Sequence, residues 1–230
     1  MINQKSWGEQ HQLLKSIVLK PERFEEAINL CLELHAMVHS SEMSSGKTST
    51  FEDEVWEGLD EKSFRCKPTL KDRTIAWNLW HLARIEDITM NILVASQAQV
   101  IHSEKWLEKM NVQIQDTGNA MTDEEIVDFS SRLNMQALRN YRIAVGRKTR
   151  EIISGFKAVD LKRKMNNPQN LARILEEGAV LEHPDSKWLV DFWGRKNVAG
   201  ILLMPVTRHQ MVHIHDSIRL KGKCRALHLR

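Results

Sequence analysis

The sequence lacks the cysteine pattern of a disulfide framework or of a zinc knuckle. Its three cysteines, Cys31, Cys66 and Cys224, are odd in number, lie far apart and form no Cys-x-x-Cys pair. Scattered cysteines of this kind are typical of reduced thiols in the cytosol. We therefore expect a cytoplasmic protein whose fold does not depend on disulfide bonds.

Long apolar runs and a strong net charge are also absent. No stretch approaches the roughly 18 consecutive apolar residues of a membrane span, and residues 1–20 lack the apolar core of a signal peptide. The formal net charge is only +3, whereas a nucleic-acid binder normally has a concentrated basic face. These absences predict a soluble protein that binds neither membranes nor nucleic acid.

Strand-like alternation is missing too, and the apolar residues recur at helical spacing instead. No segment alternates with period two for long enough to form a convincing strand, and no repeat is visible. The pattern predicts four long helices, at about 21–38, 74–95, 133–153 and 205–220. Shorter helices are predicted at 51–59, 103–110, 170–178 and after His183. The predicted fold class is all-α, a four-helix bundle with extra short helices in its connections.

Several residues mark where the predicted helices begin and end. Residues 40–50 are rich in Ser, Gly and Thr, which predicts a loop. Thr122 and Glu125 have the spacing of a capping box. Pro205 fits the first turn of a helix better than its interior, and Gly222 is expected to end that last helix.

Histidines at helical spacing suggest a metal site. His209 and His213 are four residues apart, so a helix places both imidazoles on one face. Ten histidines make one such pair unremarkable, and His35 and His39 form another. His81, however, lies on the inward face of a second long helix, where a lone histidine would more often bond a backbone carbonyl. Three imidazoles with open positions for water would form a catalytic divalent metal site, since a structural site normally has four protein ligands.

Neighbouring polar residues are candidates for supporting roles. Asp216 follows His213 by three residues, so it is expected either to orient a ligand imidazole or act as a base, or to be merely solvated. Asn78, one turn before His81, is a similar candidate. We expect His35 to cap the end of its helix rather than approach the site, and His215 to be exposed. The tryptophans are expected to serve in packing.

Two stretches carry a family resemblance. Residues 80–87 read WHLARIED, and residues 204–213 read MPVTRHQMVH. Together they resemble the DinB/YfiT-like superfamily, whose members are regarded as metal-dependent enzymes built on a four-helix bundle. The resemblance implies one domain over residues 1–230 with a core at about 21–222. It also implies a divalent ion, zinc or nickel foremost, held by His81, His209 and His213.

The resemblance also implies an activity. Characterised relatives include transferases that join a low-molecular-weight thiol such as bacillithiol to an electrophile, and hydrolases; many form homodimers. Thiol transfer is therefore expected first and hydrolysis second, with a non-catalytic stress-response or binding bundle that keeps the site as the alternative. The chain departs from the family pattern after His213, where Ile214–Ser217 replaces Arg-Gly-Gln, and in extra residues at 157–197. Both departures leave the substrate open.

Overall fold

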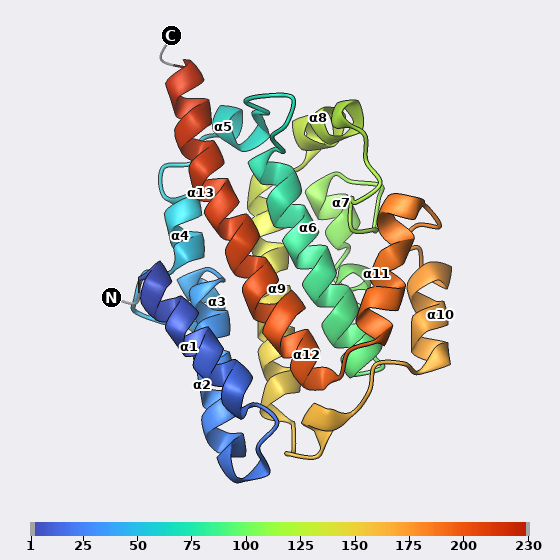
Figure 1. The fold of residues 1–230 in the computed structure, drawn as a ribbon. Helices are drawn as coiled ribbons and strands as arrows, with labels where there is room; N and C mark the ends of the chain where they lie inside the picture. The colour runs from blue at the N-terminus through green and yellow to red at the C-terminus, as the bar shows by residue number, and fades with distance from the viewer. Residues whose placement is uncertain (1–2, 229–230) are drawn as a thin grey trace.

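The computed structural model describes residues 3–228, and none of these residues belongs to a β-strand. Four long helical segments form a bundle (Figure 1). They are α2 (Phe24–Met37), α6 (Ile75–Asp87) continued by a π-helical stretch (Ile88–Val94), α9 (Met135–Ser154), and α12 (Val198–Leu203) continued by a π-helical turn (Met204–Arg208) and α13 (His209–His228). The predicted all-α class and the four long helices are confirmed.

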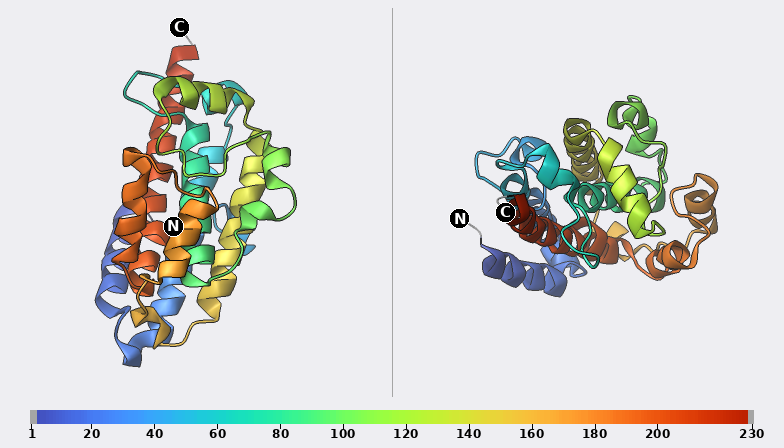
Figure 2. Two further views of the ribbon diagram at one scale, coloured as in Figure 1. Left: turned by 90° about the vertical axis from the view of Figure 1, so that its right-hand side faces the viewer. Right: turned by 90° about the horizontal axis from the view of Figure 1, so that it is seen from above.

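The other helices lie in the connections of the bundle, except the first helix, which precedes it. They are α1 (Gln4–Ile17), α3 (Ser41–Ser44), α4 (Phe51–Trp56), α5 (Glu61–Arg65), α7 (Trp106–Met110), α8 (Asp123–Arg132), α10 (Pro168–Glu176) and α11 (Pro184–Gly194), with 3₁₀ turns at Pro21–Arg23, Val100–His102 and Asp160–Lys162. The capping box at the start of α8 is confirmed, because Thr122 and Glu125 bond each other's backbone N–H groups. Viewed from above, α10 and α11 stand outside the bundle (Figure 2).

The order of the long helices around the bundle brings α6 and α13 together. Helix α13 packs against α6, α6 against α9, and α2 lies between α9 and the π-helical turn that precedes α13. Every residue from Ile75 to Val94 is buried. A polar side chain on this segment must therefore find its partner inside the protein, because water does not reach it.

Pro205 does not begin a helix, so this prediction is wrong. It lies within the continuous helical segment from α12 to α13, and the backbone accommodates its missing N–H with a π-helical turn. Two carbonyls just before Pro205 accept from side chains: the Thr207 hydroxyl donates to Leu202 O at 2.7 Å, and His11 Nε2 donates to Leu203 O at 3.0 Å. A π turn holds one extra residue, so it rotates the following helix face by about 100°. The direction in which His209 points depends on this turn.

Two other predicted boundaries are corrected. Residues 40–50 are not all loop, because Ser40 caps the single-turn helix α3 by accepting from Glu42 N. Helix α13 does not end at Gly222 but continues to His228. Buried Lys221 donates to Glu57 O at 3.0 Å, which ties this part of α13 to α4 and its C-terminal end. Tertiary packing therefore outweighs the local tendency of glycine to end a helix.

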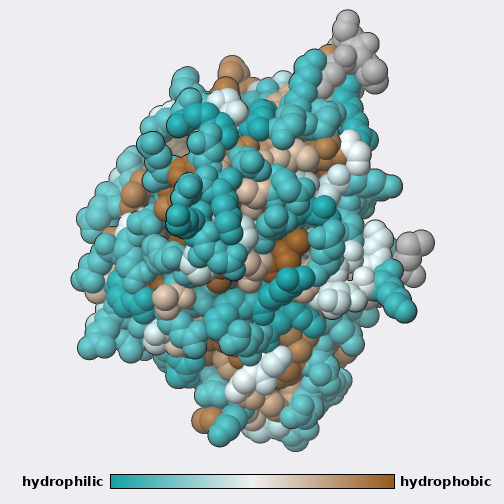
Figure 3. Space-filling view, turned by 180° about the vertical axis from the view of Figure 1, so that it is seen from behind, coloured by the Kyte–Doolittle hydropathy of each residue, from teal (hydrophilic) through white to brown (hydrophobic). Residues whose placement is uncertain are grey.

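The surface agrees with the modest hydropathy of the sequence. No helix in the described part of the chain is both long and apolar enough to span a bilayer. The face seen from behind is largely hydrophilic, with small apolar areas scattered over it (Figure 3).

Candidate metal centre

His81 is held by its own helix and by the loop at 116–118. Three donors on α6 reach three consecutive backbone carbonyls of this loop. The pairs are Trp80 Nε1 with Asp116 O at 3.1 Å, His81 Nδ1 with Thr117 O at 2.9 Å, and Trp77 Nε1 with Gly118 O at 3.0 Å. A carbonyl only accepts, so His81 carries its proton on Nδ1 and, when neutral, presents the lone pair of Nε2 to the bundle interior.

The loop depends on glycine at one position. Gly118 has φ +73°, and a Cβ at this residue would lie 2.8 Å from Trp77 Nε1. The indole of Trp77 in turn stacks on the imidazole of His81, with ring centroids 4.7 Å apart and planes 6° apart. The orientation of His81 is therefore fixed on two sides, by a hydrogen bond and by a ring. The sequence analysis identified His81 but not this loop, which has no local motif to reveal it.

The structure brings His209 and His213 to His81, as predicted. The Nε2 atoms of His81 and His209 are 3.2 Å apart. The ring centroids of the three histidines are separated by 4.7 to 5.0 Å, and one nitrogen from each falls within 4.8 Å of the others. We call these three residues the imidazole cluster. It lies between α6 and α13, the two adjacent helices at the front of Figure 1.

The side-chain amide of Asn78 orients His213, although the sequence analysis had considered Asn78 as a partner of His81. Asn78 Oδ1 accepts from His213 Nδ1 at 3.2 Å, while Asn78 Nδ2 donates to Asp216 Oδ2 at 3.1 Å and to Ser217 Oγ at 3.3 Å. This places the proton of neutral His213 on Nδ1 and its lone pair on Nε2. Asn78 thus orients His213 rather than His81.

Asp216 contacts the imidazole cluster only through Asn78. Its second oxygen, Oδ1, accepts from Arg219 Nε at 3.0 Å. Both carboxylate oxygens are therefore occupied, which favours the orienting role over that of a base. His215, two residues from His213, points outward and is exposed, as expected.

Burial keeps the cluster neutral. Desolvation lowers the pKa of His81 to about 3 and that of His213 to about 4, and it holds the pKa of His209 well below the ordinary value. Near pH 7 all three rings are uncharged, so their lone pairs are free to bind a cation. The Nε2 atoms of His81 and His209 face each other, and no described carboxylate lies between them as a partner. A divalent metal ion fits this donor set.

His35 and His39 do not join this cluster and form another one with Glu86. His35 Nε2 and His39 Nε2 each lie 2.8 Å from a different oxygen of Glu86. All three side chains are buried, and the expectation that His35 caps the end of α2 is wrong. Their residue types could also bind a metal. Each carboxylate oxygen accepts from one imidazole, so this cluster differs from the imidazole cluster in containing its own anionic acceptor.

The pKa shifts predict an acid-sensitive fold. Burial lowers the pKa of His35 from 6.5 to about 4, with the nearby His39 adding to the effect. Between these values the unfolded chain binds more protons than the folded one, so stability falls as pH falls. In urea unfolding of the metal-free protein, His35 alone should reduce stability by about 2 kcal/mol between pH 7 and pH 5, and the lowered pKa values of His81, His209 and His213 should add to this loss. Equal stability at both pH values would contradict this prediction, and His215→Ala, as a control, should leave the difference unchanged.

A cavity of about 440 Å³ opens at the imidazole cluster. Its walls come from α6, from the Met204–Pro205 turn and from α11. The lining side chains are Trp77, His81, Ile85, Asn119, Trp188, Leu189, Phe192, Trp193, Met204, Pro205, His209 and His213. Three of the tryptophans therefore face the site, while Trp7 and Trp80 pack inside the bundle as expected. Helix α11 lies within the extra residues at 157–197, whose contribution to the site the sequence analysis did not identify.

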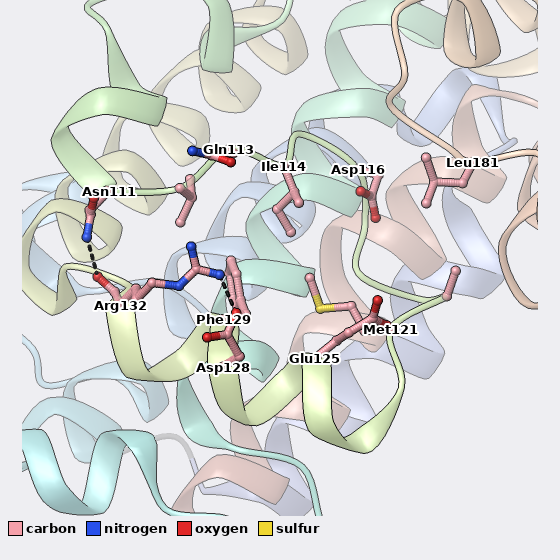
Figure 4. A pocket seen from close by; sticks show the side chains of 12 residues that line it. Asn111, Gln113, Ile114, Asp116, Met121, Glu125, Asp128, Phe129, Arg132 and Leu181 are labelled. Atoms are coloured by element: carbon pink, nitrogen blue, oxygen red, sulfur yellow. Dashed lines mark hydrogen bonds and ion pairs between the residues drawn. The ribbon is translucent and has the colours of Figure 1, made fainter.

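A second cavity, of about 310 Å³, lies elsewhere and contains none of the histidines. It is enclosed by the loop after α7, by α8 and by Leu181 (Figure 4). Asp128 and Arg132 pair with each other on α8, and Asp116 lies at the back of this cavity, where burial raises the pKa of its carboxyl. No group of metal-ligating residues meets here among those described, so this cavity is not the candidate site.

Known proteins show which family the chain belongs to. The chain is similar in structure to a conserved protein from Enterococcus faecalis, with 15% sequence identity and a TM-score of 0.45, over 86% of this chain and 92% of that one. No curated protein matches it. The family model of the DinB superfamily matches residues 53–215, which include all three histidines of the cluster and more than half of the chain. The chain belongs to the DinB superfamily.

Proposed function

We propose that the chain is a metal-dependent enzyme that binds one divalent ion, zinc or nickel, through Nε2 of His81, His209 and His213. One observation carries the proposal: three neutral imidazoles converge at the end of a cavity, with no fourth His, Cys, Asp or Glu ligand among the described residues. A structural site would normally be closed by a fourth protein ligand. Here the remaining side faces space that a water molecule or a substrate can enter.

Neighbouring groups of the protein fix the orientation of two of the three histidine rings. Thr117 fixes the ring of His81, and Asn78, held by Asp216, fixes that of His213. Such partners of metal-binding histidines set both the tautomer and the ring orientation. The apolar walls restrict water beside the cluster, which strengthens electrostatic interactions there. A bound divalent ion would lower the pKa of a coordinated water or thiol into the neutral range.

Among possible reactions we favour the transfer of a thiol to an electrophilic carbon. In this reaction the thiol sulfur forms a bond to carbon, the leaving group departs with the bonding electron pair, and the thiol proton passes to solvent. The uncharged, apolar cavity suits the electrophile, and the family resemblance favours the same chemistry. Hydrolysis by water at the same site is the competing reaction.

Product analysis distinguishes these reactions. The protein, loaded with zinc or with nickel, would be incubated with bacillithiol and 1-chloro-2,4-dinitrobenzene, and thioether formation followed against the uncatalysed rate. We expect acceleration that chelator removes and that His213→Ala lacks. Metal-loaded protein that gives no thioether above background would contradict thiol transfer. Phenol formation without thiol would indicate hydrolysis, and metal binding with neither product would indicate a non-catalytic bundle.

Replacing Asn78 tests the role of the amide that holds His213. Asn78→Ala removes the acceptor at His213 Nδ1, so the ring loses its fixed tautomer and orientation. We expect metal affinity to fall about 10- to 100-fold, as is usual when such a partner is removed. Competition with a chromophoric chelator measures this affinity. Exposed Asn140→Ala is the control, and unchanged affinity in Asn78→Ala would contradict the assigned role.

A further inference from the structure

The wall that α11 contributes to the cavity is aromatic and has a partly open rim. Trp188 and Phe192 are one turn apart on α11, with ring centroids 5.8 Å apart in an edge-to-face arrangement. Trp188 is 50% exposed although it is a large apolar residue, and its indole N–H donates to Asp185 O at 2.9 Å. The ring is therefore held in place at the mouth of the cavity rather than packed into the core.

The walls of the cavity around α11 are apolar. Apart from the three histidines, the described lining contains no Lys, Arg, Asp or Glu. A charged group placed against these walls would lose hydration without compensation, whereas an apolar ring avoids this cost. Flat aromatic rings additionally gain from stacking on tryptophan and phenylalanine.

The size and lining of the cavity are those of a small-molecule site. Its volume of about 440 Å³ lies in the range of such sites, and Asn119 contributes an amide side chain to the same lining as Trp188. A mostly apolar wall with a few polar groups is typical of a binding pocket.

We propose that this cavity binds a small molecule with an aromatic ring, which lies against Trp188 and Phe192 and directs its polar end toward the imidazole cluster. This inference rests on the proposed function, because the reacting end of the molecule would meet the ion held by His81, His209 and His213. The specificity would thus come from α11, which lies in the segment 157–197, and not from the helices that hold the metal.

Calorimetric titration of the zinc-loaded protein with 2-naphthol tests the proposal. This probe is neutral near pH 7 and carries a hydroxyl that can meet Asn119 or the ion. We expect Trp188→Ala and Phe192→Ala each to weaken binding about tenfold while zinc content stays the same. Because Trp188 is half exposed, its replacement should leave the fold intact. Leu181→Ala, which alters the other cavity, is the matched control and should bind 2-naphthol like the unaltered protein.

The outcomes distinguish failure of this proposal from failure of the proposed metal site. Unchanged affinity for 2-naphthol in both aromatic variants, or no binding by the unaltered protein at millimolar probe, would overturn the pocket. Equal affinity for decahydro-2-naphthol, which has a similar size but no aromatic ring, would overturn its preference for aromatic molecules. Failure of the proposed function would appear separately, as absence of zinc from the unaltered protein when its metal content is measured.

Discussion

Replacing His81 or His213 with alanine should abolish metal binding. Each substitution removes one of only three ligands, and two imidazoles rarely hold a divalent ion at a catalytic site. We expect one equivalent of zinc or nickel per chain in the unaltered protein and less than about a tenth of an equivalent in either variant after dialysis. Inductively coupled plasma mass spectrometry measures this ratio directly.

His215→Ala is the matched control for these variants. It removes an exposed histidine from the same helix, two residues after His213, and should keep a full equivalent of metal. Circular dichroism would establish that each variant remains helical. If His81→Ala and His213→Ala bind as much metal as the unaltered protein, the imidazole cluster is not the site. The cluster of His35, His39 and Glu86 would then be the next to test.

Replacing Glu86 with alanine should cause the largest loss of stability. Its carboxylate is completely buried and accepts from two imidazoles at 2.8 Å. Burial alone would raise the pKa of Glu86, but His39 and His35 hold it well below the ordinary value, so the group is charged at neutral pH. Alanine leaves both imidazoles without their acceptor and creates a hole at the centre of the bundle. We expect the free energy of unfolding to fall by about 3–5 kcal/mol.

Urea unfolding at pH 7 measures this loss. Glu86→Gln should lose less, because its amide oxygen can still accept from one of the two imidazoles. Glu33→Ala replaces an exposed glutamate on α2 and should change stability by no more than about 0.5 kcal/mol. A loss below about 1 kcal/mol for Glu86→Ala would mean that His35 and His39 find other partners. The metal content of Glu86→Gln should remain that of the unaltered protein.

The sequence was informative where function depends on regular spacing. His209 and His213 share a face on any helix, and His81 lies on the inward face of a helix whose apolar residues are easily recognised. Their convergence was therefore predictable once both helices were assigned to a bundle. The capping box at Thr122 was equally local, because its two hydrogen bonds join residues only three apart.

Features that join distant segments were not predictable in this way. Glu86 reads as part of a helical motif, yet its partners, His35 on α2 and His39 just after it, lie about 50 residues earlier in the chain. Thr117 contributes only a backbone carbonyl, which every residue possesses, so no residue type marks its role. Pro205 was misread because a π-helical turn lets the helix continue through it, and a side chain from α1, His11, bonds the backbone of this turn at Leu203 O.

The sequence by itself determined the all-α class, the positions of the long helices and the helix faces on which the three histidines lie. Each of these depends on periodicity within one segment. Only the tertiary structure decided which imidazole Asn78 holds, where His35 and His39 point, and that α11 forms the aromatic wall of the cavity. These depend on which side chains approach one another from separate helices. Periodicity specifies the inward face of a helix, but the neighbour that this face meets is set by the packing of the whole bundle.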